Sequence, residues 1–163
     1  MSKVPADYSN TSAKLKDRFL EIIEEEEWYD KDKSNSEIAE RIGIDKSVVS
    51  NLLNYDIIPS VKSLVKIADY FDVSIEYLIN RTDKNEFIKG VGNETFSERI
   101  SGLKNERKLR IADITNKCSF SRNSIHVWSK RDNIPSLVYL IELANFFDVS
   151  IDYLLGRSDD RQN

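Results

Sequence analysis

The side chains most often used in catalysis and metal binding are scarce in this chain, which has one histidine, His126, and one cysteine, Cys118. A zinc site needs three or four His, Cys or carboxylate ligands at short, regular spacings. His126 has no partner at such a spacing, so we expect no metal, and we expect Cys118 to be a small buried apolar residue. The sequence also lacks a phosphate-binding glycine loop and a nucleophile motif. It therefore predicts a protein that is not an enzyme and that has no cofactor.

Composition and charge narrow the class of protein further. Of the 163 residues, 40% are hydrophobic and 32% are charged, and no apolar run approaches the roughly 18 residues of a membrane helix. The N-terminus has no apolar signal segment, and a single cysteine cannot form an internal disulfide. We therefore expect a cytoplasmic protein without membrane contact. The net charge of −4 is uneven, since residues 11–83 carry 10 basic and 16 acidic side chains and residues 94–163 carry 11 and 10.

The chain contains an internal repeat with a period of 76 residues. The segment Ile58–Asp83 aligns without gaps to Ile134–Asp159, and 14 of the 26 positions are identical. A repeat of this length indicates two small domains rather than one. The predicted organisation is a flexible N-terminus at 1–12, domain 1 at 13–83, a linker at 84–93, domain 2 at 94–159 and a tail at 160–163.

Apolar residues recur at helical spacing in both repeats, which predicts an all-α protein. In domain 1, Ser34 and Glu37 form a capping-box pattern at the start of a helix. Gly43 suits the left-handed conformation that ends this helix, and Asp45 can cap the next one. Two short helices and a tight turn between them form a helix-turn-helix pattern.

The two repeats share an order of capping, core, turn and proline positions. In domain 1 these positions are Ser34, Ile38, Ala39, Gly43, Asp45, Val49 and Pro59. In domain 2 they are Ile114, Ser121, Ile125, Trp128 and Pro135. This order resembles the Cro/repressor, or XRE-type, helix-turn-helix domains of phage and bacterial regulators. The resemblance implies two tandem lambda-repressor-like domains of four to five helices each, in a sequence-specific DNA-binding transcriptional regulator of the repressor type.

The resemblance also implies which side chains contact double-stranded DNA, because the family places its third helix in the major groove. The first, second and sixth residues of that helix face the bases. In domain 1 these are Lys46, Ser47 and Asn51, and in domain 2 they are Arg122, Asn123 and Val127. The other expected contacts are Asn35, Ser50, Ser121, Ser124, His126, Lys130 and Arg131.

Domain 2 is predicted to be the stronger DNA-binding domain. Arg122 can pair bidentately with guanine, Asn123 can do the same with adenine, and Val127 can contact a thymine methyl group. In domain 1, the acidic residues at 24–27, 30 and 32 would repel phosphates. The helix-turn-helix segments of the two repeats are identical at only two of 24 positions. We therefore infer that the domains have different targets, or that one of them alone binds DNA.

Two departures from the family pattern bear on DNA binding. The family's glutamine at the start of the second helix, which holds a phosphate, is Asn35 in domain 1 and Ile111 in domain 2. Isoleucine cannot form a side-chain hydrogen bond. The turn glycine is replaced by Ser119 in domain 2, which predicts a reshaped turn.

The sequence leaves the assembly and the partner open. One chain can place two different helices in successive major grooves, about 34 Å apart, or domain 1 can be an assembly module through which chains form a homodimer. A protein-binding regulator, antirepressor or antitoxin-like, that keeps the fold without DNA binding is a further alternative. Its partner would bind the acidic domain 1, with Trp28 and Tyr29 as aromatic anchors.

Overall fold

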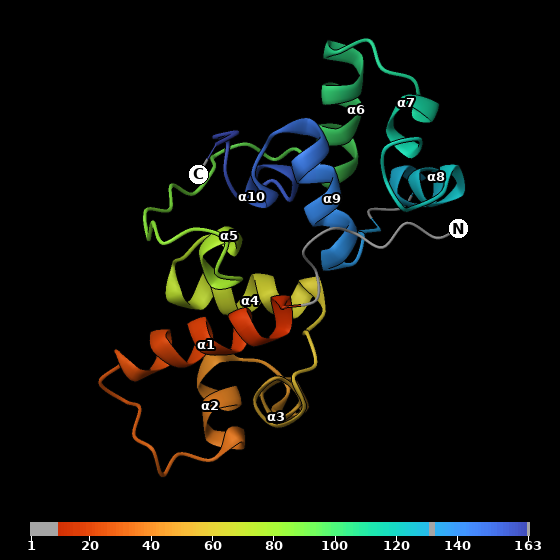
Figure 1. Cartoon of the computed structure of the whole chain (residues 1–163). Helices are drawn as coiled ribbons and strands as arrows, with labels where there is room; N and C mark the ends of the chain where they lie inside the picture. The colour runs from red at the N-terminus through yellow and green to blue at the C-terminus, as the bar shows by residue number, and fades with distance from the viewer. Residues whose placement is uncertain (1–9, 131–132, 163) are drawn as a thin grey trace. The chain divides into compact units, whose positions relative to one another are not determined.

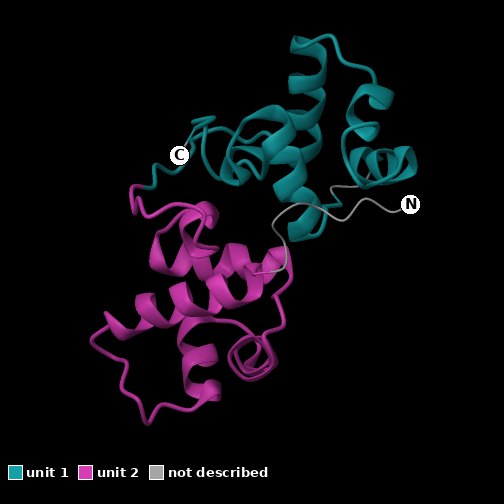
Figure 2. Ribbon diagram, in the orientation of Figure 1, with its two compact units in different colours: residues 1–6, 87–163 teal, residues 7–86 magenta. Residues whose placement is uncertain are grey.

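A computed structural model describes residues 10–130 and 133–162 of the chain. These residues form ten α-helices and no β-strand, so the prediction of an all-α chain is confirmed for the described part (Figure 1). The chain divides into an N-terminal unit of residues 7–86, magenta in Figure 2, and a C-terminal unit that contains residues 87–163, teal in Figure 2. The division between the units falls inside the predicted linker.

The N-terminal unit consists of five helices. They are α1 (Thr11–Glu24), α2 (Asn35–Ile42), α3 (Lys46–Tyr55), α4 (Val61–Phe71) and α5 (Ile75–Leu78). Helix α1 contacts α3 and α5, and α2 contacts α3 and α4. Fully buried side chains such as Phe19, Leu52 and Leu64 come from three of these helices. The pair α2–α3 is therefore held against a core that α1 and α4 supply.

Local sequence explains where α2 and α3 begin and end. The Glu37 N–H donates to Ser34 Oγ at 3.2 Å, and the Ser34 N–H donates to Glu37 Oε2 at 2.8 Å. The bonds that the Ser34 N–H and Oγ donate to the Glu37 carboxylate hold the pKa of Glu37 below its ordinary value. Gly43 ends α2 in the left-handed conformation with a φ of 85°, and Asp45 caps α3 by accepting a hydrogen bond from the Ser47 N–H at 2.8 Å. The predicted caps and turn of this helix-turn-helix are confirmed.

The C-terminal unit has five helices in the same order. They are α6 (Phe96–Glu106), α7 (Ile111–Thr115), α8 (Arg122–Lys130), α9 (Leu137–Phe147) and α10 (Ile151–Leu154). Helix α6 contacts α8 and α10, α7 contacts α8, and α9 contacts α10. Leu140 and Phe147 of α9 are fully buried, and Cys118 is buried as predicted. The core of this unit is therefore built around α9.

In each unit, a buried arginine of the first helix binds a carboxylate that lies beyond the last helix. In the N-terminal unit, Arg18 Nη2 donates to Asp83 Oδ1 at 2.9 Å. In the C-terminal unit, Arg99 Nη2 donates to Asp159 Oδ1 at 2.7 Å. Each guanidinium group also lies over a tyrosine ring, 4.1 and 4.2 Å from its centroid. The two arginines therefore tie the first helix of each unit to the chain segment that follows its last helix.

The predicted linker at 84–93 contacts the C-terminal unit along its second half. The Gly90 N–H donates to Arg157 O at 2.7 Å, and the Val91 N–H donates to Asp159 Oδ2 at 2.8 Å. A Cβ atom at position 90 would lie only 3.0 Å from the backbone nitrogen of Asp159, so a glycine permits this close approach. This half of the segment is part of the C-terminal unit and not a free connection.

The described residues of the two predicted terminal segments lie in a helix or form hydrogen bonds. Helix α1 begins at Thr11, inside the segment 1–12. In the predicted tail, Arg161 Nη2 donates to Glu106 Oε2 at 2.6 Å, and Gln162 Nε2 donates to the Asp148 carbonyl at 2.7 Å. The last described residues therefore bind to the C-terminal unit.

Candidate nucleic-acid interface

Helices α3 and α8 carry most of the side chains that the sequence assigns to DNA contact. Each follows a shorter helix, α3 after the three-residue turn 43–45 and α8 after the six-residue connection 116–121, and the helices of each pair are in contact (Figure 1). Each helix turns apolar side chains toward its own unit, Val49 and Leu52 in α3 and Ile125 in α8. The opposite side of each helix is available for contact.

The exposed side of α8 brings five predicted contact residues together. Arg122, Asn123, His126, Val127 and Lys130 are all exposed, and Val127 is 45% exposed although it is apolar. Their spacings of one, three and four residues place them on one face of a helix. The sequence of α8 contains no Asp or Glu. This face therefore presents cations and hydrogen-bonding groups around an apolar side chain, with no carboxylate of its own to repel an anion.

The remaining contacts predicted for domain 2 lie around the start of α8 and beyond its end. Ser121 is exposed and Ser124 is half-buried. The Ser124 N–H donates to Ser121 Oγ at 3.4 Å, so the Ser121 hydroxyl group caps the helix start. Arg131 lies outside the described residues.

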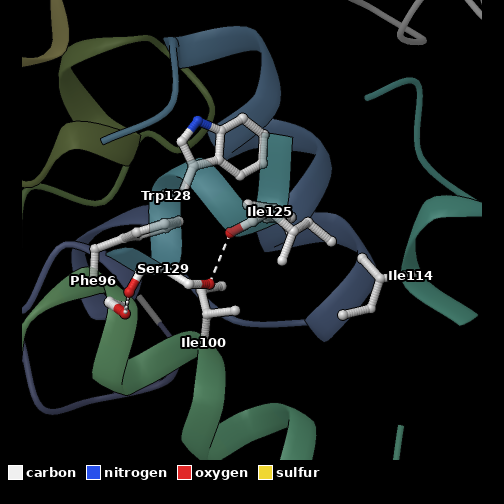
Figure 3. A pocket seen from close by; sticks show the side chains of 8 residues that line it. Phe96, Ile100, Ile114, Ile125, Trp128 and Ser129 are labelled. Atoms are coloured by element: carbon white, nitrogen blue, oxygen red, sulfur yellow. Dashed lines mark hydrogen bonds between the residues drawn. The ribbon is translucent and has the colours of Figure 1, made fainter. Parts of the chain in front are cut away.

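Beneath α8 the side chains leave a small apolar cavity of about 10 Å³. Figure 3 shows Ile125 and Trp128 of α8, together with Phe96 and Ile100 of α6, around this space. Its volume is about that of one water-sized sphere. The cavity is therefore a packing gap between α6 and α8 and too small to hold an organic ligand.

Hydrogen bonds and an aromatic contact hold the C-terminal half of α8. Ser129 Oγ donates to the Ile125 carbonyl at 2.7 Å, and Ser97 Oγ of α6 donates to the Ser129 carbonyl at 3.1 Å. Trp128 packs edge-on against Phe120 with 4.9 Å between the ring centroids. Helix α8 is therefore attached to its unit by a mixture of polar and aromatic contacts.

Helix α3 presents a different set of side chains. Lys46 and Ser47 are exposed, whereas Ser50 and Asn51 are half-buried. Asn54 Nδ2 donates to Ser50 Oγ at 3.3 Å, so part of the polar face is bonded within the helix. The four residues predicted for contact in α3 thus share one helix but are less accessible than those of α8.

Two carboxylates flank α3. Hydrogen bonds from the Ser47 side chain and backbone hold the pKa of Asp45 below its ordinary value, so Asp45 is ionised at neutral pH beside the helix N-terminus. At the other end, Asp56 pairs with Lys16 Nζ at 3.4 Å. Asn35, the remaining contact predicted for domain 1, is the first residue of α2 and is half-buried. The negative charge of Asp45 reduces the attraction of α3 for phosphates.

The loop after α1 combines acidic and aromatic side chains. Trp28 Nε1 donates to Glu26 Oε2 at 2.9 Å, and the Arg41 guanidinium group lies 5.8 Å from the Trp28 ring centroid. Tyr70 of α4 makes an edge-on contact with Trp28 at 6.5 Å and is 38% exposed. Trp28 and Tyr29, the predicted anchors, are half-buried. They form an acidic–aromatic surface with Tyr70.

One contact beside the predicted interface was not anticipated from the sequence. Ser119, in the turn before α8, donates hydrogen bonds to the carboxylate of Glu142 on α9. The signal was present in the repeat, since the corresponding positions in the N-terminal unit hold Gly43 and Lys66. At these two positions the C-terminal unit has a donor and an acceptor that the N-terminal unit lacks.

Comparison with known proteins assigns the helix-turn-helix of the N-terminal unit. Residues 30–78, which include α2 to α5, match the family model described as Helix-turn-helix, and the XRE-type resemblance is confirmed for this segment. An uncharacterized HTH-type transcriptional regulator, YobD of Bacillus subtilis (strain 168), is 31% identical to the chain over 65 residues. The alignment spans 40% of this chain and 58% of that regulator's length. No solved structure matches the chain.

Membrane-spanning and metal-binding features do not occur in the described part of the chain. No helix within residues 10–130 and 133–162 has both the length and the apolar character needed to cross a membrane. Within the same residues, no three or more His, Cys, Asp and Glu side chains gather in a way that could hold a metal ion.

Proposed function

We propose that this chain is a sequence-specific DNA-binding transcriptional regulator whose C-terminal unit makes the principal DNA contacts through α8. The helix-turn-helix match at residues 30–78 and the similarity to a protein named as a transcriptional regulator support the class. The shared repeat and the shared helix order support a second domain of the same kind in the C-terminal unit. The regulator is repressor-like in this proposal and acts by occupying its DNA site.

The exposed face of α8 is the observation that carries this proposal. The Arg122 guanidinium group can donate two hydrogen bonds to guanine O6 and N7, and the Asn123 amide can pair with adenine N6 and N7. The exposed Val127 side chain suits a thymine methyl group. His126 and Lys130 lie on the same face, where Lys130 can neutralise a phosphate. The face thus combines side chains that can distinguish bases with a side chain that can contact the DNA backbone.

Helix α3 is the weaker candidate for base recognition. Lys46 is a point charge without the rigid fork of arginine, and it lies next to the ionised Asp45. Ser47 offers a single hydroxyl group, which discriminates poorly between bases. We therefore assign the N-terminal unit mainly to assembly, and propose that two chains pair through it.

Selection of bound sequences from a random pool of double-stranded DNA, with the full-length chain, tests this proposal. We expect enrichment of a defined sequence. A palindrome would indicate paired chains that each insert α8, whereas two unlike half-sites would indicate that α3 and α8 of one chain both bind. The proposal fails if no sequence is enriched, or if Arg122→Ala and Lys130→Ala leave DNA binding unchanged.

A protein-binding regulator is the second candidate, and the acidic–aromatic surface formed by Trp28, Tyr29 and Tyr70 favours it. Partly exposed aromatic side chains beside the carboxylates of Glu24–Glu27 suit a basic protein partner. Under this alternative, the chain binds every sequence of the random pool equally weakly. Trp28→Ala then removes the effect of the chain on transcription, whereas Arg122→Ala leaves that effect unchanged.

A further inference from the structure

We propose that Glu142 of α9 is a positioning residue that fixes the turn before α8 and so orients the DNA-contacting face of that helix. This inference rests on the proposed function of α8. The Ser119 N–H donates to both carboxylate oxygens of Glu142, at 3.2 and 3.3 Å. Ser119 Oγ donates to Oε2 of the same carboxylate at 2.7 Å. One ionisable side chain therefore binds both hydrogen-bond donors of the turn residue.

The N-terminal unit has a shorter turn at the corresponding place, residues 43–45 instead of 116–121, and holds it by different contacts. Gly43 adopts the left-handed conformation, and its N–H donates to the Ala39 carbonyl at 2.8 Å. A serine is strained in that conformation, and Ser119 does not adopt it. The Ser119 N–H donates to Glu142. In the N-terminal unit the position that corresponds to Glu142 holds Lys66, an exposed cation without acceptor capacity. The contact between Ser119 and Glu142 thus takes the place of the backbone hydrogen bond that Gly43 makes in the other repeat.

Glu142 connects the turn to the most central helix of its unit. Its neighbours Ile141 and Leu143 are buried, which fixes the backbone that carries the carboxylate. Ser119 precedes Arg122 by three residues, so a displaced turn would displace the first base-contacting side chain. Hydrogen bonds to an ionised acceptor are about twice as strong as neutral ones. Binding groups need such support to stay within about 0.5 Å of a productive position.

Helix α8 depends on this support more than α3 depends on its own turn. Among the nine residues of α8, all of which the structure describes, Ile125 is the buried one. Helix α3 buries two residues, Val49 and Leu52. Beyond Ile125, α8 has the half-buried Trp128 packed against Phe120, so loss of the turn's acceptor removes one of a small number of contacts that hold this helix.

Amide hydrogen exchange on the full-length chain, without DNA, tests the positioning role directly. We expect Glu142→Ala to accelerate exchange at Ser119 and along α8 at least tenfold, with α6 and α10 unchanged. Glu142→Gln keeps one acceptor oxygen but loses the charge, so it should accelerate exchange less than Glu142→Ala does. Ser119→Ala loses the hydroxyl bond alone and should be intermediate, which keeps the test informative if Glu142→Ala does not fold. The matched control is Lys66→Ala, which should leave exchange in α3 unchanged.

DNA binding supplies the readout that a purely structural role would not change. The probe is the duplex that the wild-type chain enriches from the random pool. Glu142→Ala should bind it about tenfold more weakly and with less preference among single-base variants, and Glu142→Gln should lie between Glu142→Ala and the wild-type chain in both respects. Unchanged exchange at α8, or equal acceleration in α6, α8 and α10, overturns the positioning role. If the wild-type chain enriches no DNA while the exchange results hold, Glu142 still positions α8 and it is the proposed function that fails.

Discussion

Arg122 and Lys46 occupy the same position in the two repeats, yet their surroundings make them differently suited to bind DNA. Arg122 begins a helix that contains no carboxylate, and its fork of donors matches a guanine edge. Lys46 follows Asp45, whose pKa is held low by hydrogen bonds with Ser47, so a negative charge stays beside it at neutral pH. Equivalent positions in a repeat therefore do not imply equivalent contacts.

The first prediction concerns these two residues. Arg122→Ala should cost about 1–3 kcal/mol of binding free energy, concentrated at one base pair, because it removes a bidentate contact. Lys46→Ala should cost much less. Titration of each variant with the selected duplex and its single-base variants measures both effects. An equal reduction in affinity for all sequences with Arg122→Ala would show instead that Arg122 contacts phosphate.

At the scale of helices and connections, both units are closed by the same arrangement. Arg18 and Arg99 reach from the first helix of each unit to a carboxylate beyond its last helix. The chain reverses direction there through a left-handed residue, Asn80 in the N-terminal unit and Gly156 in the C-terminal unit. At Gly156 the surrounding space is also restricted, since a Cβ atom there would clash with the Glu94 carbonyl oxygen. Glycine at this turn is therefore a packing requirement as well as a conformational one.

The second prediction compares two glycines of the C-terminal unit. Gly156→Ala should destabilise the unit by at least about 1–3 kcal/mol, because it adds a backbone clash to the left-handed strain. Gly102→Ala, in the middle of α6 with open space around it, should stabilise the unit by about 0.4–1 kcal/mol.

Trp128 fluorescence during urea unfolding reports the C-terminal unit when the other tryptophan is removed by Trp28→Phe. The opposite signs expected for the two glycines make each variant a control for the other. A stable Gly156→Ala variant would show that the Glu94 backbone can move aside.

The third prediction concerns the acid stability of the same unit. Hydrogen bonds from the Val91 N–H, the Arg99 side chain and the Gly92 N–H hold the pKa of Asp159 below its ordinary value. A carboxyl group with a lowered folded-state pKa contributes its full stability above its unfolded pKa, about 3.9, and loses it as the pH falls through the folded value. Asp159→Asn should therefore reduce stability at neutral pH and flatten its decline in acid.

Urea unfolding of the C-terminal unit between pH 7 and pH 2, with the Trp128 signal, measures this change. Asp83→Asn, followed through Trp28 in a Trp128→Phe background, is the matched control in the N-terminal unit, since the Asp83 side chain is 97% exposed and should contribute little. Parallel pH curves for the wild-type chain and Asp159→Asn would contradict the assignment.

For the whole molecule, the distribution of charge matters more than its total. The chain has a net charge of −4, but residues 11–83 carry six more acidic than basic side chains, and residues 94–163 carry one more basic than acidic. Because DNA affinity depends on displacing counterions from phosphates, the C-terminal unit suits that contact better. The acidic N-terminal unit is suited to other partners or to assembly.

The fourth prediction uses salt to identify the unit that binds. A substitution that removes one side chain from a DNA phosphate reduces the slope of log K against log salt by about one. Lys130→Ala should reduce the slope by this amount, whereas Lys46→Ala should leave it unchanged. Binding of the selected duplex between about 50 and 200 mM salt measures both slopes. A reduced slope for both variants would mean that both units contact DNA.

The sequence by itself determined the features that depend on neighbouring residues. The Ser34–Glu37 capping box, the Gly43 turn and the Asp45 cap join residues at most four positions apart, and helix periodicity follows the same short range. The contact residues expected on α8 follow from the resemblance to XRE-type helix-turn-helix domains.

Only the tertiary structure decided the contacts between residues distant in the chain. Ser119 meets Glu142 across 23 positions, Arg18 meets Asp83 across 65, and Val91 meets Asp159 across 68. Such pairings depend on how the helices pack, and no local propensity encodes them. For this reason the sequence predicts a plain linker at 84–93, whereas in the fold the second half of that segment belongs to the C-terminal unit. Likewise the sequence indicates only a less suitable turn residue at Ser119, whereas in the fold Ser119 binds to α9.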